Sequence, residues 1–236
     1  MNQIAILAGG LATRLRPITN SIPKSMIEIC GKPFAHWQMK LLEKAGYTDV
    51  IYCVGYKSEA IKDFLGSGIE YDMRITYSHD GESQLGTGGA IVKALPLLGE
   101  KFSVIYGDSY LPIDFGRVEN TFSQSKKLAQ MTVYSNKEAL DTNNVVFRNG
   151  DVAQYQKGAF SKDMTHIDYG FNCFDRSSFS QYPANLSFDL GQICCDLARK
   201  EMLAGYEVFE RFYEVGSPQG LIDFSSYVER NIDELQ

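Results

Sequence analysis

The chain contains 236 residues, of which 44% are hydrophobic and 22% are charged, and its formal net charge is −6. This length suits one large domain or a domain with a smaller addition. The acidic balance argues against general binding to nucleic acid or to an anionic membrane, although it leaves room for a local basic pocket. The composition is close to that of folded globular proteins, which excludes a collagenous or disordered chain.

Neither a membrane span nor a secretion signal is expected. No apolar stretch approaches the ~20 residues that a spanning helix requires, and the N-terminal residues MNQIAILAGG lack the basic region and cleavage site of a signal peptide. The five cysteines are odd in number and form no C-x-x-C pair, so neither a disulfide framework nor a zinc site is indicated. We interpret them as reduced packing residues of a cytoplasmic protein: Cys30, Cys53, Cys173, Cys194 and Cys195. The three histidines show no metal-ligand spacing and are interpreted as structural or surface residues: His36, His79 and His166.

Strand-like and helix-like segments alternate through the first half of the chain. Short apolar runs that end at glycine or polar residues predict strands at Gln3–Leu7, Asp49–Val54, Arg74–Tyr77 and Phe102–Tyr106. Apolar residues at helical spacing predict helices at Phe34–Ala45, Ser58–Leu65 and Gly88–Leu97. We expect the Ser58 side chain to cap the second helix. This alternation predicts right-handed βαβ units and a mostly parallel sheet covered by helices on both faces.

The second half is richer in strands and contains a hairpin signal. Further strands are predicted at Ala129–Ser135, Val145–Arg148, Val152–Tyr155, Asp168–Phe174 and Leu203–Phe209, with helices near Asp189–Lys200 and Pro218–Asn231. Asn149-Gly150 lies between two of these strands and favours a type I′ turn, which needs positive φ at both central residues. We therefore expect one continuous α/β domain with a Rossmann-like, mostly parallel sheet and a small antiparallel annex over its carboxyl edge.

A glycine pair and several cations follow the first predicted strand. Gly9 and Gly10 let the backbone approach a ligand, and consecutive amides there can bind phosphate oxygens. Arg14 and Arg16 follow within one turn, and Lys24 stands behind a proline. The spacing matches neither the dinucleotide-binding motif nor the P-loop. A phosphate site is favoured over a solvated basic loop, which stays open on spacing alone.

The pattern G-G-x-x-T-R-L-x-P-x-T followed by P-K-x-M resembles the opening of the sugar-1-phosphate nucleotidylyltransferases. The residues that match are Gly9, Gly10, Thr13, Arg14, Leu15, Pro17, Thr19, Pro23, Lys24 and Met26. The resemblance implies transfer of a nucleotidyl group from an NTP to a sugar 1-phosphate, with release of pyrophosphate. It also implies a nucleotide-binding part at about 1–128, a sugar-binding part at about 129–217 and a C-terminal helix at about 218–232.

Other segments resemble further motifs of the same family. Leu85–Ala90 (LGTGGA) resembles the segment beside the nucleotide base, although a helix entry that needs small residues would read the same way. Asp108 lies in a stretch similar to the element whose aspartate binds Mg²⁺, and a carboxylate at the end of a buried strand needs a partner or a metal. Lys157 matches the lysine that contacts the sugar phosphate. Glu214 stands where the family has its second metal-binding aspartate, a departure that keeps a hard oxygen ligand.

The resemblance assigns a role to each candidate site residue. The catalytic residues expected are Arg14, Lys24 and Asp108, and Asp108 with Glu214 would hold Mg²⁺ as the cofactor. The nucleotide-binding residues expected are Leu7, Ala8, Gly9, Gly10, Thr13, Glu82, Leu85, Gly86 and Thr87. The residues expected at the sugar phosphate are Lys157, Gly170 and Asn172, and Asn143, Asn144 and Asn172 are candidates for hydroxyl recognition or for turns. The partners expected are small-molecule substrates, and a homo-oligomer is left open.

The substrate pair is less closely defined by the sequence. G-K-P-F near residue 31, V-G-Y-K near residue 54 and the chain length are most similar to heptose 1-phosphate guanylyltransferases, which make GDP-activated heptose for surface polysaccharides. Asp80 or Glu82 could accept hydrogen bonds from guanine, or simply be solvated. A uridylyltransferase acting on a hexose or N-acetylated sugar shares much of the pattern, and a regulatory homologue without catalysis is a second alternative. A glycosyltransferase is disfavoured, because Gly107–Tyr110 (GDSY) lacks the second carboxylate of a D-x-D motif.

Overall fold

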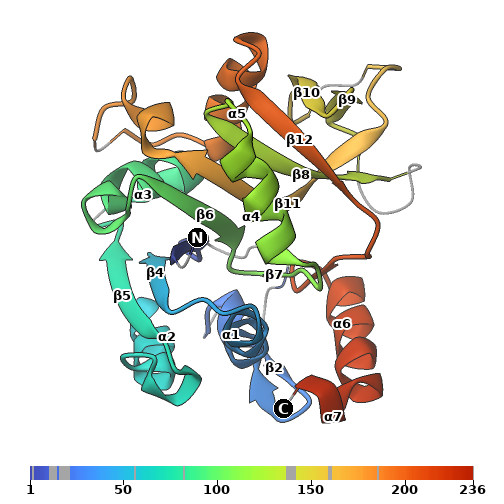
Figure 1. Ribbon diagram of the computed structural model, residues 1–236. Coiled ribbons are helices and arrows are strands. Elements are labelled where there is room, and N and C mark those ends of the chain that lie inside the picture. The colour runs from blue at the N-terminus through green and yellow to red at the C-terminus, as the bar shows by residue number, and fades with distance from the viewer. Residues whose placement is uncertain are drawn as a thin grey trace.

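A computed structural model describes residues 1, 3–10, 15, 22–55, 57–81, 83–136, 142–158, 161–184 and 186–235 (Figure 1). Over these residues, nine strands form one continuous sheet. In spatial order they are β5 (Arg74–His79), β4 (Asp49–Val54), β1 (Gln3–Leu7), β6 (Lys101–Tyr106), β11 (His166–Asp175), β8 (Ala129–Ser135), β12 (Leu203–Val208), β10 (Asp151–Tyr155) and β9 (Val145–Arg148). The sheet runs from β5 at one side of the molecule to the β9–β10 hairpin at the other.

Most neighbouring strands of the first half run parallel. β5, β4, β1 and β6 are parallel to one another, β11 is antiparallel to both β6 and β8, and β12 is parallel to β8. The β9–β10 hairpin adds the antiparallel edge. Asn149 and Gly150 join its strands with φ of 53° and 83°, as the hairpin prediction required. The α/β class is confirmed, and the structure shows that the strands of the second half extend the same sheet.

Helices cover both faces of this sheet, as predicted. They are α1 (Phe34–Lys44), α2 (Ser58–Leu65), α3 (Gly86–Ala94), α4 (Phe115–Gln124), α5 (Leu190–Arg199), α6 (Pro218–Arg230) and α7 (Ile232–Leu235). Alternate residues of β1 show the two faces: Ala5 and Leu7 pack with α3 and α5, whereas Ile4 and Ile6 pack with α1, α2 and α4. A third apolar cluster joins α6 to the start of α1, where the Phe34 and Phe224 rings lie 5.2 Å apart.

Several local expectations differ from the structure. The predicted helix at Gly88–Leu97 is α3 followed by a short 3₁₀ turn, Leu95–Leu97. Ser58 does not cap α2: Lys57 occupies the cap position with a φ of 58°, and over the described residues this position provides no side-chain capping hydrogen bond. The short antiparallel pairs β2 (Glu28–Ile29) with β3 (Lys32–Pro33), and β7 (Ser109–Tyr110) with β13 (Tyr213–Glu214), were not predicted. Two-residue strands have too few residues for an alternation pattern.

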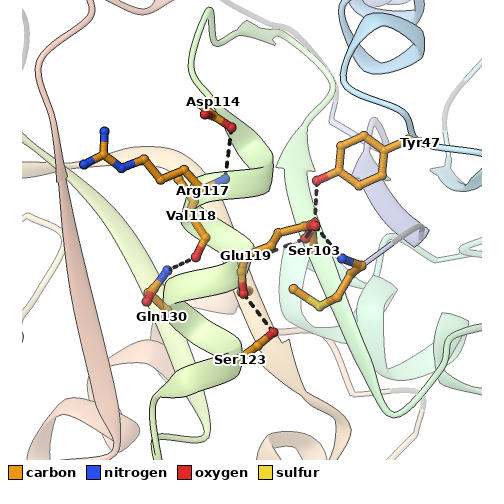
Figure 2. A network of polar contacts seen from close by, with 10 residues as sticks. Tyr47, Ser103, Asp114, Arg117, Val118, Glu119, Ser123 and Gln130 are labelled. Carbon is orange, nitrogen blue, oxygen red and sulfur yellow. Dashed lines mark hydrogen bonds and ion pairs between the residues drawn. The ribbon is translucent and has the colours of Figure 1, made fainter.

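Helix α4 was also not predicted, and it carries a buried carboxylate. Glu119 is only 5% exposed, and its Oε1 accepts hydrogen bonds from the Tyr47 and Ser103 hydroxyls, each at 2.6 Å (Figure 2). Its Oε2 lies 2.6 Å from the α-amino group of Met1. A buried charge that lost these partners would strongly destabilise the fold, so the network fixes α4 against β6.

The five cysteines differ in how far they are buried. The five thiols are free: Cys53, Cys173 and Cys194 are buried as packing predicts, Cys195 is partly buried, and Cys30 is exposed, so packing does not describe that residue. Across the described parts of the chain, every helix is too short or too polar to cross a membrane.

Candidate active site

A cavity of about 320 Å³ opens at the carboxyl ends of β1 and β6. The two strands pair in parallel, and the Gly107 amide donates to the Leu7 carbonyl at 2.9 Å. The loops that follow them therefore lie side by side, at the edge where open parallel sheets usually bind ligands. The residues that line the cavity are Leu7, Ala8, Gly9, Gly10, Lys24, Ser25, Asp80, Gln84, Gly86, Thr87, Ala90, Tyr106, Gly107, Asp108 and Ser187.

Many of the candidate residues lie on this wall, although they come from distant parts of the chain. The first loop contributes the residues from Leu7 to Gly10, α3 contributes Gly86 and Thr87, and Lys24 and Asp108 face each other. Leu85 is buried and does not line the cavity. Three candidates fall outside the described residues: Thr13, Arg14 and Glu82. The roles assigned to all of these residues stay predictions.

Lys24 and Asp108 form an ion pair inside the cavity. Lys24 Nζ lies 2.8 Å from Asp108 Oδ2, and the two side chains are 24% and 30% exposed. Lys24 begins a single 3₁₀ turn after Pro23, whose extended backbone directs the chain toward the cavity. Because both groups keep access to solvent, either partner can exchange its contact for a phosphate oxygen or a cation.

The peptide of Asp108 is closely held by its surroundings. A Cβ at Gly107 would lie 2.8 Å from the Ala8 Cβ, so only glycine fits beside the first loop. The Asp108 carbonyl accepts from the Val215 amide at 2.9 Å. This contact continues the β7–β13 ribbon, in which Glu214 pairs with Ser109. The second candidate metal ligand is therefore on the strand that pairs with the end of the Asp108 turn.

The donor set of this corner suits a hard divalent cation. Asp108 offers a carboxylate from the turn between β6 and β7, and Glu214 offers one from β13, where its exposed side chain lies outside the lining of the cavity. Among the residues that the structure describes, no three His, Cys, Asp or Glu side chains gather into a complete metal site. Proteins typically bind Mg²⁺ through one or two carboxylates, and phosphate oxygens and water fill the remaining coordination positions. The residues present thus fit the expected cofactor.

Asp80 is an acidic residue of the cavity wall. It is 9% exposed, and its Oδ2 would lie 3.0 Å from a Cβ placed at Gly9 and 3.2 Å from one at Gly55. Burial raises the pKa of Asp80, whereas a hydrogen bond from the Leu85 amide and the charge of Lys93 lower it. A side chain at position 9 would therefore crowd the Asp80 carboxylate.

The glycine-rich start of α3 fits against a crossing segment, residues Leu186–Leu190, which we call the strap. A Cβ at Gly86 would lie 2.5 Å from the Phe188 carbonyl oxygen, and one at Gly89 would lie 2.3 Å from the Leu186 carbonyl oxygen. Gly86 also has a φ of 67°, which favours glycine. The small residues at this helix entry are thus required by the strap, which supports the structural interpretation of LGTGGA.

Hydrogen bonds fasten the strap to α3. The Phe188 amide donates to the Leu85 carbonyl at 3.0 Å, and the Gly88 amide donates to the Phe188 carbonyl at 2.9 Å. Thr87 Oγ1 accepts from the Leu190 amide at 2.8 Å. Thr87 therefore lines the cavity and also holds the first residue of α5.

Lys157 does not line the cavity itself but lies beside Tyr106, which does, and it is bound to the strap. Its Nζ is 3.0 Å from Asp189 Oδ1 and 3.3 Å from Oδ2, and it lies 5.7 Å from the centre of the Tyr106 ring. Asp189 also accepts from the Gly191 amide at 2.7 Å and so caps α5. Tyr106 lines the cavity, so Lys157 is next to the cavity wall through this ring. Burial, followed by the charge of Asp168, raises the pKa of Tyr106 well above its ordinary value, so its hydroxyl stays protonated.

The other sugar-side candidates lie on β11. Gly170 has a φ of 105°, and a Cβ there would lie 3.5 Å from the Tyr106 ring. Asn172 is 2% exposed, and its Oδ1 has no hydrogen-bond partner among the described residues. Asp168 accepts from the Gly170 amide at 3.0 Å and from the Tyr155 hydroxyl at 3.3 Å. Burial raises the pKa of Asp168, and the charge of Lys157 lowers it.

Two of the three asparagines considered for recognition of sugar hydroxyls form hydrogen bonds within the protein. Asn143 Oδ1 accepts from the Asn136 side chain at 3.1 Å, and Asn144 Oδ1 accepts from the Asp168 amide at 3.0 Å. These contacts favour the structural reading of both asparagines. The residues that sequence reasoning missed are Gln84, Tyr106, Asp168, Ser187 and Asp189. The sequence indicated Asp189 as an N-cap, because an aspartate there begins a predicted helix, but nothing in the sequence showed that it would contact Lys157.

Comparison with known proteins places the whole fold in one family. Residues 4–230 match the family model described as nucleotidyl transferase. The chain belongs to the nucleotidyl transferase family. The expected family and class of enzyme, a sugar-1-phosphate nucleotidylyltransferase, are confirmed.

Three similar proteins illustrate the range of substrates in this family. The chain is 28% identical to D-glycero-alpha-D-manno-heptose 1-phosphate guanylyltransferase of Campylobacter jejuni over 94% of its own length and 98% of that protein. It is 39% identical to N-acetylmuramate alpha-1-phosphate uridylyltransferase of Neisseria meningitidis, and this match covers 50% of the chain and 52% of that protein's length. The structure of HddC from Yersinia pseudotuberculosis complexed with GMP-PN has a TM-score of 0.78 at 25% identity, and the match covers 96% of this chain and 99% of that one.

Proposed function

We propose that this enzyme transfers a guanylyl group from GTP to a manno-heptose 1-phosphate in a Mg²⁺-dependent reaction that serves surface polysaccharide synthesis. The observation that carries the proposal is the Lys24–Asp108 pair, 2.8 Å apart, in a cavity that is also lined by the glycine loop and by Tyr106, the neighbour of Lys157. The near full-length similarity to heptose 1-phosphate guanylyltransferases supports the substrate pair.

In the proposed reaction a phosphate oxygen of the sugar 1-phosphate attacks the α-phosphorus of GTP, and pyrophosphate leaves on the opposite side. This chemistry depends on positioning and charge neutralisation, and the attacking phosphate is already ionised, so no general base is needed. Lys24 would turn from Asp108 toward the α-phosphate and offset the charge that develops there. Arg14, which lies outside the described residues, is proposed to neutralise the leaving pyrophosphate.

The acceptor phosphate would be held from the other side of the cavity. Lys157 lies close to the Tyr106 ring and is oriented by Asp189, so its ammonium group can bind the sugar phosphate without a large movement. Asp108 and Glu214 would hold the Mg²⁺ ion. When bound, the ion would supply a positive charge to the phosphate oxygens of the nucleotide.

Asp80 supports guanine as the base. Its carboxylate lies on the cavity wall beside Gly9, and an acidic acceptor suits the N1–H and N2 amino groups of guanine, which uracil lacks. The alternative is a uridylyltransferase acting on a hexose or N-acetylated sugar 1-phosphate, which the similarity to the Neisseria enzyme favours over half of the chain. A weakly catalytic regulatory homologue is the third reading. The proposed location is the cytoplasm.

Pyrophosphate release decides among these readings. The purified protein with Mg²⁺ is tested with ATP, CTP, GTP, UTP and dTTP against a panel of sugar 1-phosphates that includes a manno-heptose. Turnover confined to GTP with the heptose supports the proposal, and turnover confined to UTP with another sugar replaces it with the alternative. Binding of nucleotide without turnover of any pair, together with binding of a sugar nucleotide, would identify the regulatory homologue.

A further inference from the structure

A buried glutamine holds the turn that carries Asp108. Gln38 lies on α1 and is 0% exposed, and its side-chain Nε2 donates to the Tyr106 carbonyl at 2.9 Å and to the Ser109 carbonyl at 2.7 Å. These two carbonyls stand on either side of Gly107-Asp108. One side chain therefore bridges the end of β6 and the start of β7.

The orientation of this amide follows from its partners. Both neighbours are carbonyl oxygens, which only accept hydrogen bonds, so the NH₂ group must face them. The Gln38 Oε1 is left without a hydrogen-bond partner among the described residues. An unpaired buried acceptor lowers stability, and an apolar side chain would suit this position beside Ala35, Met39 and Leu42 of the core better. A glutamine here lowers packing quality but supplies two donors to the turn.

We infer that Gln38 is a positioning residue for the Asp108 carboxylate. This inference rests on the proposed role of Asp108 as a metal ligand. The turn is also held by backbone bonds from Gly107 to Leu7 and from Val215 to Asp108. Those bonds fix the central peptides, and Gln38 fixes the carbonyls at the two ends, so that the peptide planes that set the direction of the Asp108 side chain cannot rotate independently.

A metal ligand must be placed accurately, so the contacts that hold the Asp108 turn should affect metal binding. Productive sites are held to within about 0.5 Å by the residues around them. Removing the two donors would take one hydrogen-bond partner from each of the Tyr106 and Ser109 carbonyls, and the turn would relax to find others. Loss of such supporting contacts typically weakens metal affinity by about 10- to 100-fold.

The test compares two buried glutamines that differ in what they hold. Gln38→Met keeps an unbranched side chain of similar size and removes both donors. Gln130→Met is the matched control, because Gln130 is 1% exposed and its Nε2 donates to the Val118 carbonyl at 2.8 Å (Figure 2). Its Oε1, like that of Gln38, has no hydrogen-bond partner within the described part of the chain. Both variants lose a buried donor to a backbone carbonyl, but Gln130 contacts α4, away from the cavity.

Mn²⁺ affinity is the decisive measurement, made by calorimetric titration of Mn²⁺ in the presence of a non-hydrolysable GTP analogue. Gln38→Met is expected to weaken Mn²⁺ binding at least about 10-fold. It should also raise the Mg²⁺ concentration for half-maximal pyrophosphate release by a similar factor. Gln130→Met should leave both values within about twofold of wild type, even though it destabilises the fold. If Gln38→Met does not fold, Gln38→Asn keeps a neutral amide that is one methylene too short to bridge both carbonyls, and it is assessed against the same control.

Asp108→Asn separates failure of this inference from failure of the proposed function. If Asp108→Asn loses Mn²⁺ affinity while Gln38→Met keeps it, the metal site stands and Gln38 has no positioning role. If Gln38→Met and Gln130→Met weaken Mn²⁺ binding equally, the effect is one of general stability and the inference is overturned. If wild type and Asp108→Asn bind Mn²⁺ alike, the proposed metal site is wrong, and the role of Gln38 falls with it.

Discussion

The strongest stability prediction concerns one glycine of α3. Gly89→Ala places a Cβ 2.3 Å from the Leu186 carbonyl oxygen, well inside an ordinary contact of about 3.5 Å. Because the obstacle is backbone of the strap, relief requires the helix or the strap to move, and such overpacking costs about 1–3 kcal/mol or more. Alanine gains up to about 1 kcal/mol over glycine inside a helix. The net expectation is a loss of about 1–2 kcal/mol in the free energy of unfolding.

Gly116→Ala is the matched control for this substitution. Gly116 also lies in a helix, α4, but among the residues that the structure describes its Cβ would meet only the Asp114 carboxylate oxygen, at 3.5 Å. The same exchange should therefore stabilise the protein slightly. Urea unfolding followed by circular dichroism gives both free energies. If Gly89→Ala proved as stable as Gly116→Ala, the strap would not be fixed against α3, and the argument from close contact would be refuted.

Three further predictions concern the cavity. Lys24→Ala and Asp108→Ala should each lower turnover by about two orders of magnitude or more, since each removes charge stabilisation from the site; near wild-type pyrophosphate release by either folded variant would contradict its role. Asp189→Asn should raise the KM for the sugar phosphate severalfold while leaving the KM for the nucleotide unchanged, because it frees Lys157 from its orienting partner; equal changes in both constants would count against this. Burial raises the pKa of Asp80, so the folded protein binds its proton more tightly than the unfolded chain and this residue lowers stability increasingly as the pH rises above about 4. Asp80→Asn should therefore stabilise the protein in urea unfolding at pH 7 but not near pH 4, and a gain that is the same at both pH values would exclude the titration of Asp80 as its cause.

The sheet could be predicted from the sequence because its strands carry strong local patterns. Gln3–Leu7, Asp49–Val54 and Ala129–Ser135 are buried apolar runs, and each begins and ends where the pattern does. α4 was missed because its apolar residues are few among polar ones, although Asp114 as an N-cap and Phe115, Val118 and Phe122 on one face were available signals. The order of strands across the sheet depends on long-range pairing, which no local pattern encodes.

The candidate site was also only partly predictable from the sequence. The loop residues and Asp108 could be predicted because their chemistry follows the ends of strands, where parallel sheets bind ligands. Asp189 could not be connected with Lys157, since the two are separated by 32 positions and meet only after α5 packs on β10. Gln38 gave no signal either, because a glutamine on an apolar helix face has no motif, and its partners are backbone carbonyls.

The strap gives the two sides of the cavity a common support. Its Phe188 and Leu190 amides bond to the segment that begins α3, where Thr87 lines the proposed nucleotide side. Its Asp189 carboxylate holds Lys157 on the proposed sugar side. A displacement of the strap therefore moves both supports together. The Asp108 turn has other supports, since it follows β6 and is bonded to Gln38 of α1. It follows that Gly89→Ala, which pushes on the strap, should weaken binding of both substrates more than it slows the chemical step, unlike substitutions at Lys24 or Asp108.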